Sequence, residues 1–143
     1  MIHREKADQA QALLAEVGLD CWLTFARETA VRPDPGVELV VGSDVTWNSA
    51  FIIGRGGERI AIVGRYDAPD IRAAGIFGEV IPYDEGMREP LLAQLARLDP
   101  RSIGLNYSQD DATADGLTHG MYLLLQEMLR GSPYAERLTS AAP

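Results

Sequence analysis

Cysteine, apolar runs and signal-like segments are scarce in this chain of 143 residues. Cys21 is the only cysteine, so an intrachain disulfide is excluded and a reducing compartment is the expected environment. The first twenty residues carry charges throughout and lack the apolar stretch of a secretory signal. Apolar runs such as the one from Met121 to Leu125 are far too short to span a bilayer. The sequence therefore predicts a cytoplasmic protein without a membrane partner.

Positive charge is also in short supply. Lysine and arginine together number 13 against 21 aspartates and glutamates, which gives a formal net charge of −8. This balance argues against a nucleic-acid partner, because binding nucleic acid requires a basic face. Hydrophobic residues make up 46% of the chain and charged residues 24%, which is ordinary for one globular domain. A domain of this length buries roughly two thirds of its unfolded surface and needs no structural metal.

Hydrophobic spacing and helix breakers predict helices that alternate with strands. We expect helices over residues 4–17, 69–74, 87–98 and 117–129, with a short apolar helical turn over 37–41. We expect strands over residues 21–25, 47–53, 59–63, 79–83, 102–106 and 134–138. The glycine-rich segment between the second and third strands predicts a hairpin, whereas the later alternation predicts parallel pairing. The predicted fold class is α/β, with a mixed, mostly parallel sheet that contains one antiparallel hairpin and is flanked by helices.

The segment Gly54-Arg55-Gly56-Gly57 could be read as a phosphate-binding loop. No Gly-Lys-Ser/Thr follows it, and the next predicted element is a strand where a phosphate loop would open a helix. A hairpin turn is therefore the favoured interpretation.

Metal-binding patterns are weak. Three acidic residues precede the last predicted helix: Asp110, Asp111 and Asp115. Acids at this position favourably face the helix dipole, and their spacing does not match a calcium loop. The two histidines, His3 and His119, are too few for a histidine-based zinc site. A helical contact between Asp115 and His119 is possible, but a packed or hydrogen-bonded histidine near the helix start is the favoured interpretation. We therefore predict no metal site in this chain.

Nucleophilic residues do not assemble into a catalytic pattern either. Cys21 begins an apolar strand, so we expect a buried, inert thiol. No serine stands in a nucleophile-elbow context, and no strand centre carries paired carboxylates. No catalytic residue is predicted.

The loop from Arg27 to Pro35 is the best candidate for a functional surface. It follows the carboxyl end of the first strand, which is where ligands bind on open α/β sheets. Its two arginines and two acids could bind a carboxylate or a partner chain, or could form an ordinary solvated loop. Arg27 and Glu28 are the candidate site residues.

Six segments carry a family resemblance when they are taken in order along the chain. They are Phe25–Glu28 with Asp34-Pro35, Trp47–Ile53, Ala61–Asp67, Ile103–Ser108, Ala114–Tyr122 and Pro133–Leu138. Together they resemble the amino-terminal domain of the creatinase/prolidase/aminopeptidase P metallopeptidases, which act on Xaa-Pro bonds. Ala114–Tyr122 is the most specific segment, and the resemblance extends over nearly the whole chain.

The resemblance implies a creatinase-type amino-terminal domain over residues 1–138, with a ribonuclease H-like motif, and an interdomain linker that starts at 139–143. It also implies a following catalytic domain of pita-bread fold, which is absent from this sequence and would hold two divalent metal ions. None of the family's metal ligands maps onto a position of this chain, so no cofactor is expected here.

Two functions from different classes follow from these observations. The resemblance implies a non-catalytic domain of an Xaa-Pro dipeptidase or aminopeptidase, with its own catalytic domain and a second subunit as partners. In such a homodimer the loop with Arg27 and Glu28 would lean over a partner's active site. The alternative is a stand-alone α/β module that binds a small ligand or a protein at this loop.

Overall fold

The computed structural model describes residues 2–27, 34, 37–41, 45–108 and 116–141. The elements are α1 (Ile2–Val17), β1 (Cys21–Ala26), the π-helical turn η1 (Val37–Val41), β2 (Ser49–Gly54), β3 (Arg59–Gly64), α2 (Ala68–Ala74), β4 (Glu79–Tyr83), α3 (Arg88–Leu98), β5 (Ile103–Leu105), α4 (His119–Leu129), the 3₁₀ turn η3 (Pro133–Glu136) and β6 (Leu138–Ser140). Among these residues, no helix is both long enough and apolar enough to cross a bilayer.

The strands form one mixed sheet in the order β4-β3-β2-β1-β5-β6. Strands β2 and β3 form the expected antiparallel hairpin, and β1 is also antiparallel to β2. The remaining pairs, β1 with β5, β3 with β4 and β5 with β6, are parallel. The predicted α/β class is confirmed, and the meander β1–β2–β3 with β5 and β6 beside β1 has the strand order of a ribonuclease H-like motif.

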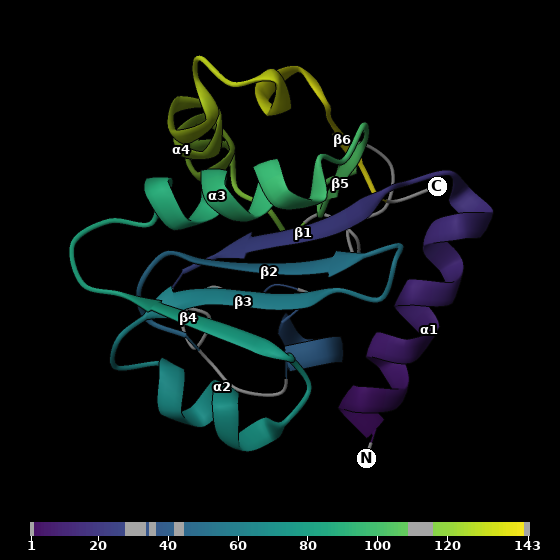
Figure 1. Ribbon diagram of the computed structural model, residues 1–143, viewed down its shortest axis with the longest axis vertical. Coiled ribbons are helices and arrows are strands. Elements are labelled where there is room, and N and C mark those ends of the chain that lie inside the picture. Colours follow the sequence, from purple (N-terminus) through teal and green to yellow (C-terminus); the bar gives the residue numbers. More distant parts are fainter. Residues whose placement is uncertain (1, 28–33, 35–36, 42–44, 109–115, 142–143) are drawn as a thin grey trace.

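Two apolar layers bury the two faces of the sheet (Figure 1). Helices α3 and α4 cover one face, packing Leu91, Leu95 and Leu125 against side chains such as Leu23. Helices α1 and α2 with η1 cover the other face, around Phe51. Both faces of β1 and β2 are therefore buried, which explains why these strands read as nearly continuous apolar runs.

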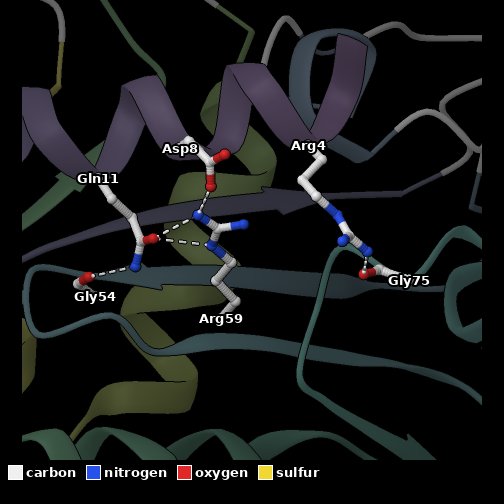
Figure 2. A network of polar contacts seen from close by, with 6 residues as sticks. All are labelled: Arg4, Asp8, Gln11, Gly54, Arg59 and Gly75. Carbon is white, nitrogen blue, oxygen red and sulfur yellow. Dashed lines mark hydrogen bonds and ion pairs between the residues drawn. The ribbon is translucent and has the colours of Figure 1, made fainter. Parts of the chain in front are cut away.

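Polar side chains connect helix α1 to the strands and loops below it in the view of Figure 2. Arg59 of β3 donates to the Asp8 carboxylate and, from Nε, to Gln11 Oε1 at 3.0 Å. Gln11 Nε2 donates in turn to the last carbonyl of β2 at 3.1 Å. Near the other end of the helix, Arg4 donates to the Gly75 carbonyl at 2.6 Å. These contacts fix the axial position of α1, which apolar packing alone leaves less specific.

The expected strand over residues 134–138 is wrong in position. Ser132 caps the 3₁₀ turn η3, since its hydroxyl oxygen accepts a hydrogen bond from the Tyr134 amide at 3.3 Å. Tyr134 is buried in this turn, and the strand begins only at Leu138, which pairs with Ile103. Because β6 extends to Ser140, the sheet includes the first two residues of the predicted linker. The domain boundary itself stays a prediction.

Candidate functional site

The carboxyl ends of several strands meet at one edge of the sheet. Strands β1, β3 and β4 end there, and β2 begins there, because Ala26 pairs with Ser49 and Gly64 pairs with Tyr83. We call this region the carboxyl edge. Arg27 is the first residue beyond β1 and is exposed at this edge. Glu28 lies outside the described residues, so the expected role of the two candidates stays a prediction.

A buried polar cluster lies beside the end of β1, on the sheet face that carries α1 and η1. Asn106, just after β5, donates from Nδ2 to Thr24 Oγ1 at 3.1 Å and to Asp34 Oδ1 at 2.9 Å. The indole Nε1 of Trp22 donates to Asn106 Oδ1 at 2.6 Å. Asp34 is 2% exposed and Asn106 8%, so the hydrogen bonds of this cluster are shielded from water. We name these four residues the Asn106 cluster.

An aromatic cluster lies at the ends of β2, β3 and β4. The ring centroids of Trp47 and Tyr66 are 5.8 Å apart in an edge-to-face arrangement, and those of Trp47 and Tyr83 are also 5.8 Å apart. Tyr83 donates its hydroxyl hydrogen to the Asn48 carbonyl at 2.6 Å. Tyr66 is 73% exposed, so the cluster presents an aromatic surface to solvent. These three rings form the aromatic cluster.

Charged groups hold the aromatic cluster in place. Asp67 Oδ2 accepts from the amide nitrogens of Thr46 and Trp47 at 3.1 and 3.3 Å. Arg65 lies over the Tyr66 ring at 5.1 Å from its centroid and forms an ion pair with Asp84 at 3.0 Å. Such a fixed group of tryptophan, tyrosine and arginine has the composition of protein-interface hot spots.

Burial and, second, the negative charge of Asp67 raise the pKa of the Tyr83 hydroxyl above its ordinary value. The phenol therefore keeps its proton at neutral pH and continues to donate to the Asn48 carbonyl. This hydrogen bond ties the end of β4 to the segment that enters β2.

Cys21 is the buried thiol that the sequence predicted. It is 1% exposed, and burial, followed by the charges of Asp20 and Glu58, raises the pKa of the thiol to about 12. A thiol with this pKa contains almost no thiolate at neutral pH, and the thiolate is the reactive form.

We therefore expect native Cys21 to resist a thiol reagent such as 5,5′-dithiobis(2-nitrobenzoic acid) at pH 8. In denaturant the thiol regains a pKa near 8.5 and should react within minutes. Absorbance of the released thionitrobenzoate measures both rates on the same sample. Rapid labelling of the folded chain at pH 8 would contradict the assigned burial.

Within the ranges that the structure describes, no three or more histidine, cysteine or acidic side chains are grouped to hold a metal ion. The acidic group Asp110, Asp111 and Asp115 falls outside those ranges. His119 is the first residue of α4, whose N-cap is Thr118, and the Thr118 hydroxyl oxygen accepts from the Met121 amide at 3.3 Å.

The opposite edge of the sheet contains two shallow depressions of about 460 and 390 Å³, which share Glu58 and Leu98. Two arginines in the walls form ion pairs. Arg97 pairs with Glu79 at 2.8 Å, and Arg55 pairs with Asp20 at 3.7 Å. The hairpin Gly54–Gly57 lies here as a turn, with the Gly57 amide donating to the Gly54 carbonyl at 3.1 Å. The residues that line these two depressions therefore present paired charges, without a nucleophile placed beside a general base.

Solved structures to which this chain is similar include Xaa-Pro peptidases and their amino-terminal domains. The chain is similar to the creatinase/prolidase N-terminal domain of an X-Pro dipeptidase from Streptococcus pyogenes, with 15% identity, a TM-score of 0.65 and coverage of 98% of this chain and 95% of that one. It is also similar to the Xaa-Pro dipeptidase from Bacillus anthracis (14% identity, TM-score 0.66) and the X-Pro aminopeptidase from Thermotoga maritima (12% identity, TM-score 0.69).

The last two alignments cover 96% and 94% of this chain but only 34% and 33% of the longer proteins. This chain therefore spans about a third of their length. No protein-family profile matches the chain, and no curated protein sequence matches it significantly. At these identities the comparisons establish the fold, which is that of creatinase/prolidase amino-terminal domains.

Proposed function

We propose that this chain is the non-catalytic amino-terminal domain of a metal-dependent Xaa-Pro dipeptidase or aminopeptidase. The supporting observation is how much of the similar structures this chain matches. It matches nearly all of one separately solved amino-terminal domain, but only about a third of two longer peptidases. On this proposal the two divalent metal ions are bound by the catalytic domain that follows in the full protein. The single free thiol supports a cytoplasmic location.

The proposed role of the domain is to form a homodimer and to shape the substrate site of the partner subunit. Arg27 is exposed at the carboxyl edge, and the aromatic cluster is anchored at the same edge. An arginine suits the carboxylate of a peptide, because its guanidinium donates two parallel hydrogen bonds. Arg27, with Glu28 beside it in sequence, is the proposed substrate-loop residue.

A direct test uses the purified chain with Xaa-Pro dipeptides in the presence of Mn²⁺ or Co²⁺. We expect no turnover above background and no tight metal binding by calorimetry. Turnover that a chelator abolishes would contradict the proposal, because it would place a catalytic centre within these residues.

The native mass of the protein in its source cell tests the missing domain. An antibody against this chain should detect a species more than twice as large as the 15.6 kDa chain. In that longer protein, Arg27→Ala should raise KM for Xaa-Pro substrates, whereas Arg55→Ala, at the opposite edge, should leave KM unchanged. A native species of 15.6 kDa would contradict the proposal.

A stand-alone binding module is the second candidate function, and the exposed aromatic cluster favours it. In that case the native mass is 15.6 kDa and a ligand should stabilise the chain. Thermal-shift measurements with amino acids, dipeptides and nucleotides test this candidate. No shift with any compound would remove the support for a small-molecule ligand.

A further inference from the structure

We propose that one flank of helix α1 is the docking surface for the domain that follows this chain in the longer protein. The surface consists of Ile2, Leu13 and Val17, with Lys6 and Gln9 between them, and we name it the α1 stripe. Because the α1 stripe needs a following domain as its occupant, this assignment rests on the proposed function. It adds the surface through which the two domains make contact.

Three large apolar side chains of α1 are exposed to solvent. Ile2, Leu13 and Val17 are 64%, 53% and 40% exposed, and Tyr66 and Leu123 are the other exposed large hydrophobic residues in the described ranges. Single exposed apolar residues are normal on a protein surface, but three on one helix are not scattered. With about 3.6 residues per turn, positions 2, 13 and 17 fall within about 60° of one another around the helix axis. They therefore share one flank of α1.

The α1 stripe also lacks the negative charge that dominates the chain. Lys6 and Gln9, which lie between its apolar residues, are both exposed, and none of its five members is acidic. The whole chain, in contrast, has a formal net charge of −8. A partner could cover the apolar side chains while the ammonium group of Lys6 stays in water at the rim of the contact. The complementary surface is therefore apolar, with acceptor groups near Lys6.

Contacts with the sheet fix which flank of α1 faces outward. Leu14 is buried, and the side chains of Asp8 and Gln11 both accept hydrogen bonds from Arg59 (Figure 2). Around the helix axis, Leu13 lies about 140° from Asp8. The α1 stripe is therefore held in its outward orientation before any partner binds, so docking requires no rotation of the helix.

The chain leaves the domain beside the end of α1 (Figure 1). Ala141, just after β6, packs against the apolar layer that includes Leu19, just after α1. Both residues approach Gly104, since a Cβ built there would lie 2.7 Å from Leu19 Cδ1 and 3.0 Å from Ala141 Cβ. Two residues of this sequence follow Ala141, and they span at most about 7 Å. On the proposed function, the polypeptide that continues from residue 143 therefore starts near the Val17 end of the α1 stripe.

The size of the α1 stripe favours a linked domain over a second copy of the chain. Stable complexes of separate molecules generally bury about 1,200–2,000 Å². A helix of 16 residues is about 24 Å long and about 10 Å wide, so one of its flanks alone does not supply such an area. Contacts between domains of one chain begin at about 600 Å², because the linker keeps the partner at a high effective concentration. A following domain is therefore the occupant that fits.

Cysteine labelling tests whether the α1 stripe is covered. Leu13→Cys and Leu123→Cys form a matched pair, because the two leucines are 53% and 51% exposed. Leu123 lies on α4, over the other face of the sheet. Peptide mass spectrometry measures how fast iodoacetamide reacts at each introduced thiol, in this chain and in the longer protein. The native thiol, Cys21, is buried and does not compete.

In this chain alone, L13C and L123C should react at rates within about threefold of each other, because both positions are open to solvent. In the longer protein, L13C should react about tenfold or more slowly than in this chain, since docking buries the side chain. The rate of L123C should change by less than about threefold between the two proteins.

A charge placed on the α1 stripe should release the domain. In the longer protein, V17C should be protected from labelling as L13C is. The double variant L13E/V17C should regain the labelling rate that V17C has in this chain, because an unpaired glutamate disfavours burial of the stripe. L123E/V17C is the matched control and should stay protected.

Three results would overturn the docking surface. The first is equal labelling of L13C in this chain and in the longer protein, and the second is equal slowing of L123C. The third is protection that disappears on dilution, because a domain of the same polypeptide protects the thiol independently of concentration. Such dilution dependence would assign the α1 stripe to a second molecule.

A failure of the docking surface differs from a failure of the proposed function. A native species of 15.6 kDa would contradict both, since no domain would follow the chain. A longer native species in which L13C is unprotected would contradict the docking surface alone.

Discussion

Replacing Gly64 with alanine should destabilise the chain by about 2–3 kcal/mol, far more than an alanine normally costs in a strand. A Cβ atom at this position would lie 2.4 Å from Trp47 Cε3 and 2.7 Å from Cδ2. The indole has little room to move, because Tyr66 and Tyr83 pack on it and its backbone amide donates to Asp67. Urea unfolding followed by circular dichroism gives the change in the free energy of unfolding.

Gly86→Ala is the matched control, because a Cβ built there meets no atom within 4 Å. This variant should change stability by less than about 0.5 kcal/mol. Tryptophan fluorescence should also separate the two variants, since only Gly64→Ala displaces Trp47. Equal stabilities for both variants would contradict the close packing of Trp47 on β3.

Truncating Leu125 to alanine should cost about 3 kcal/mol, because it removes buried methyl groups and leaves a cavity. Leu125 is fully buried between α4 and the sheet, whereas Leu123 on the same helix is 51% exposed. Leu123→Ala therefore keeps the same chemical change but should cost less than about 1 kcal/mol. Thermal unfolding of the pair is the measurement, with a fall in Tm of about 10 °C expected for Leu125→Ala. Similar values of Tm for both variants would refute the assigned orientation of α4.

The elements of the fold were predictable from local patterns. The strand over 79–83 and the helix that ends at Leu98 were placed correctly, since alternation, helical spacing and Pro100 define them within a few residues. The last strand was misplaced because Ser132 and Pro133, the N-cap and first-turn residues of a short helical turn, outweigh the strand-like residues that follow them. The sequence also does not predict that β1 pairs antiparallel with β2, because the long connection between the two strands is compatible with parallel or antiparallel pairing.

The candidate site was only partly predictable. The position of Arg27 at a carboxyl edge follows from its place after a strand. The partners of Asn106, by contrast, lie 72 to 84 residues away in sequence, so no spacing rule connects them. The aromatic cluster likewise combines the ends of three strands, and its members look isolated when each is considered in its own segment.

The strand order has a consequence for how the chain is assembled during synthesis. β1 lies inside the sheet, and each later strand joins the outside of a strand that the ribosome has already released: β2 beside β1, β3 beside β2, β4 beside β3, β5 beside β1 and β6 beside β5. No strand has to insert between two partners that are already paired. The nascent sheet therefore grows outward from its first strand, and its hairpin-linked half can form before β5 emerges.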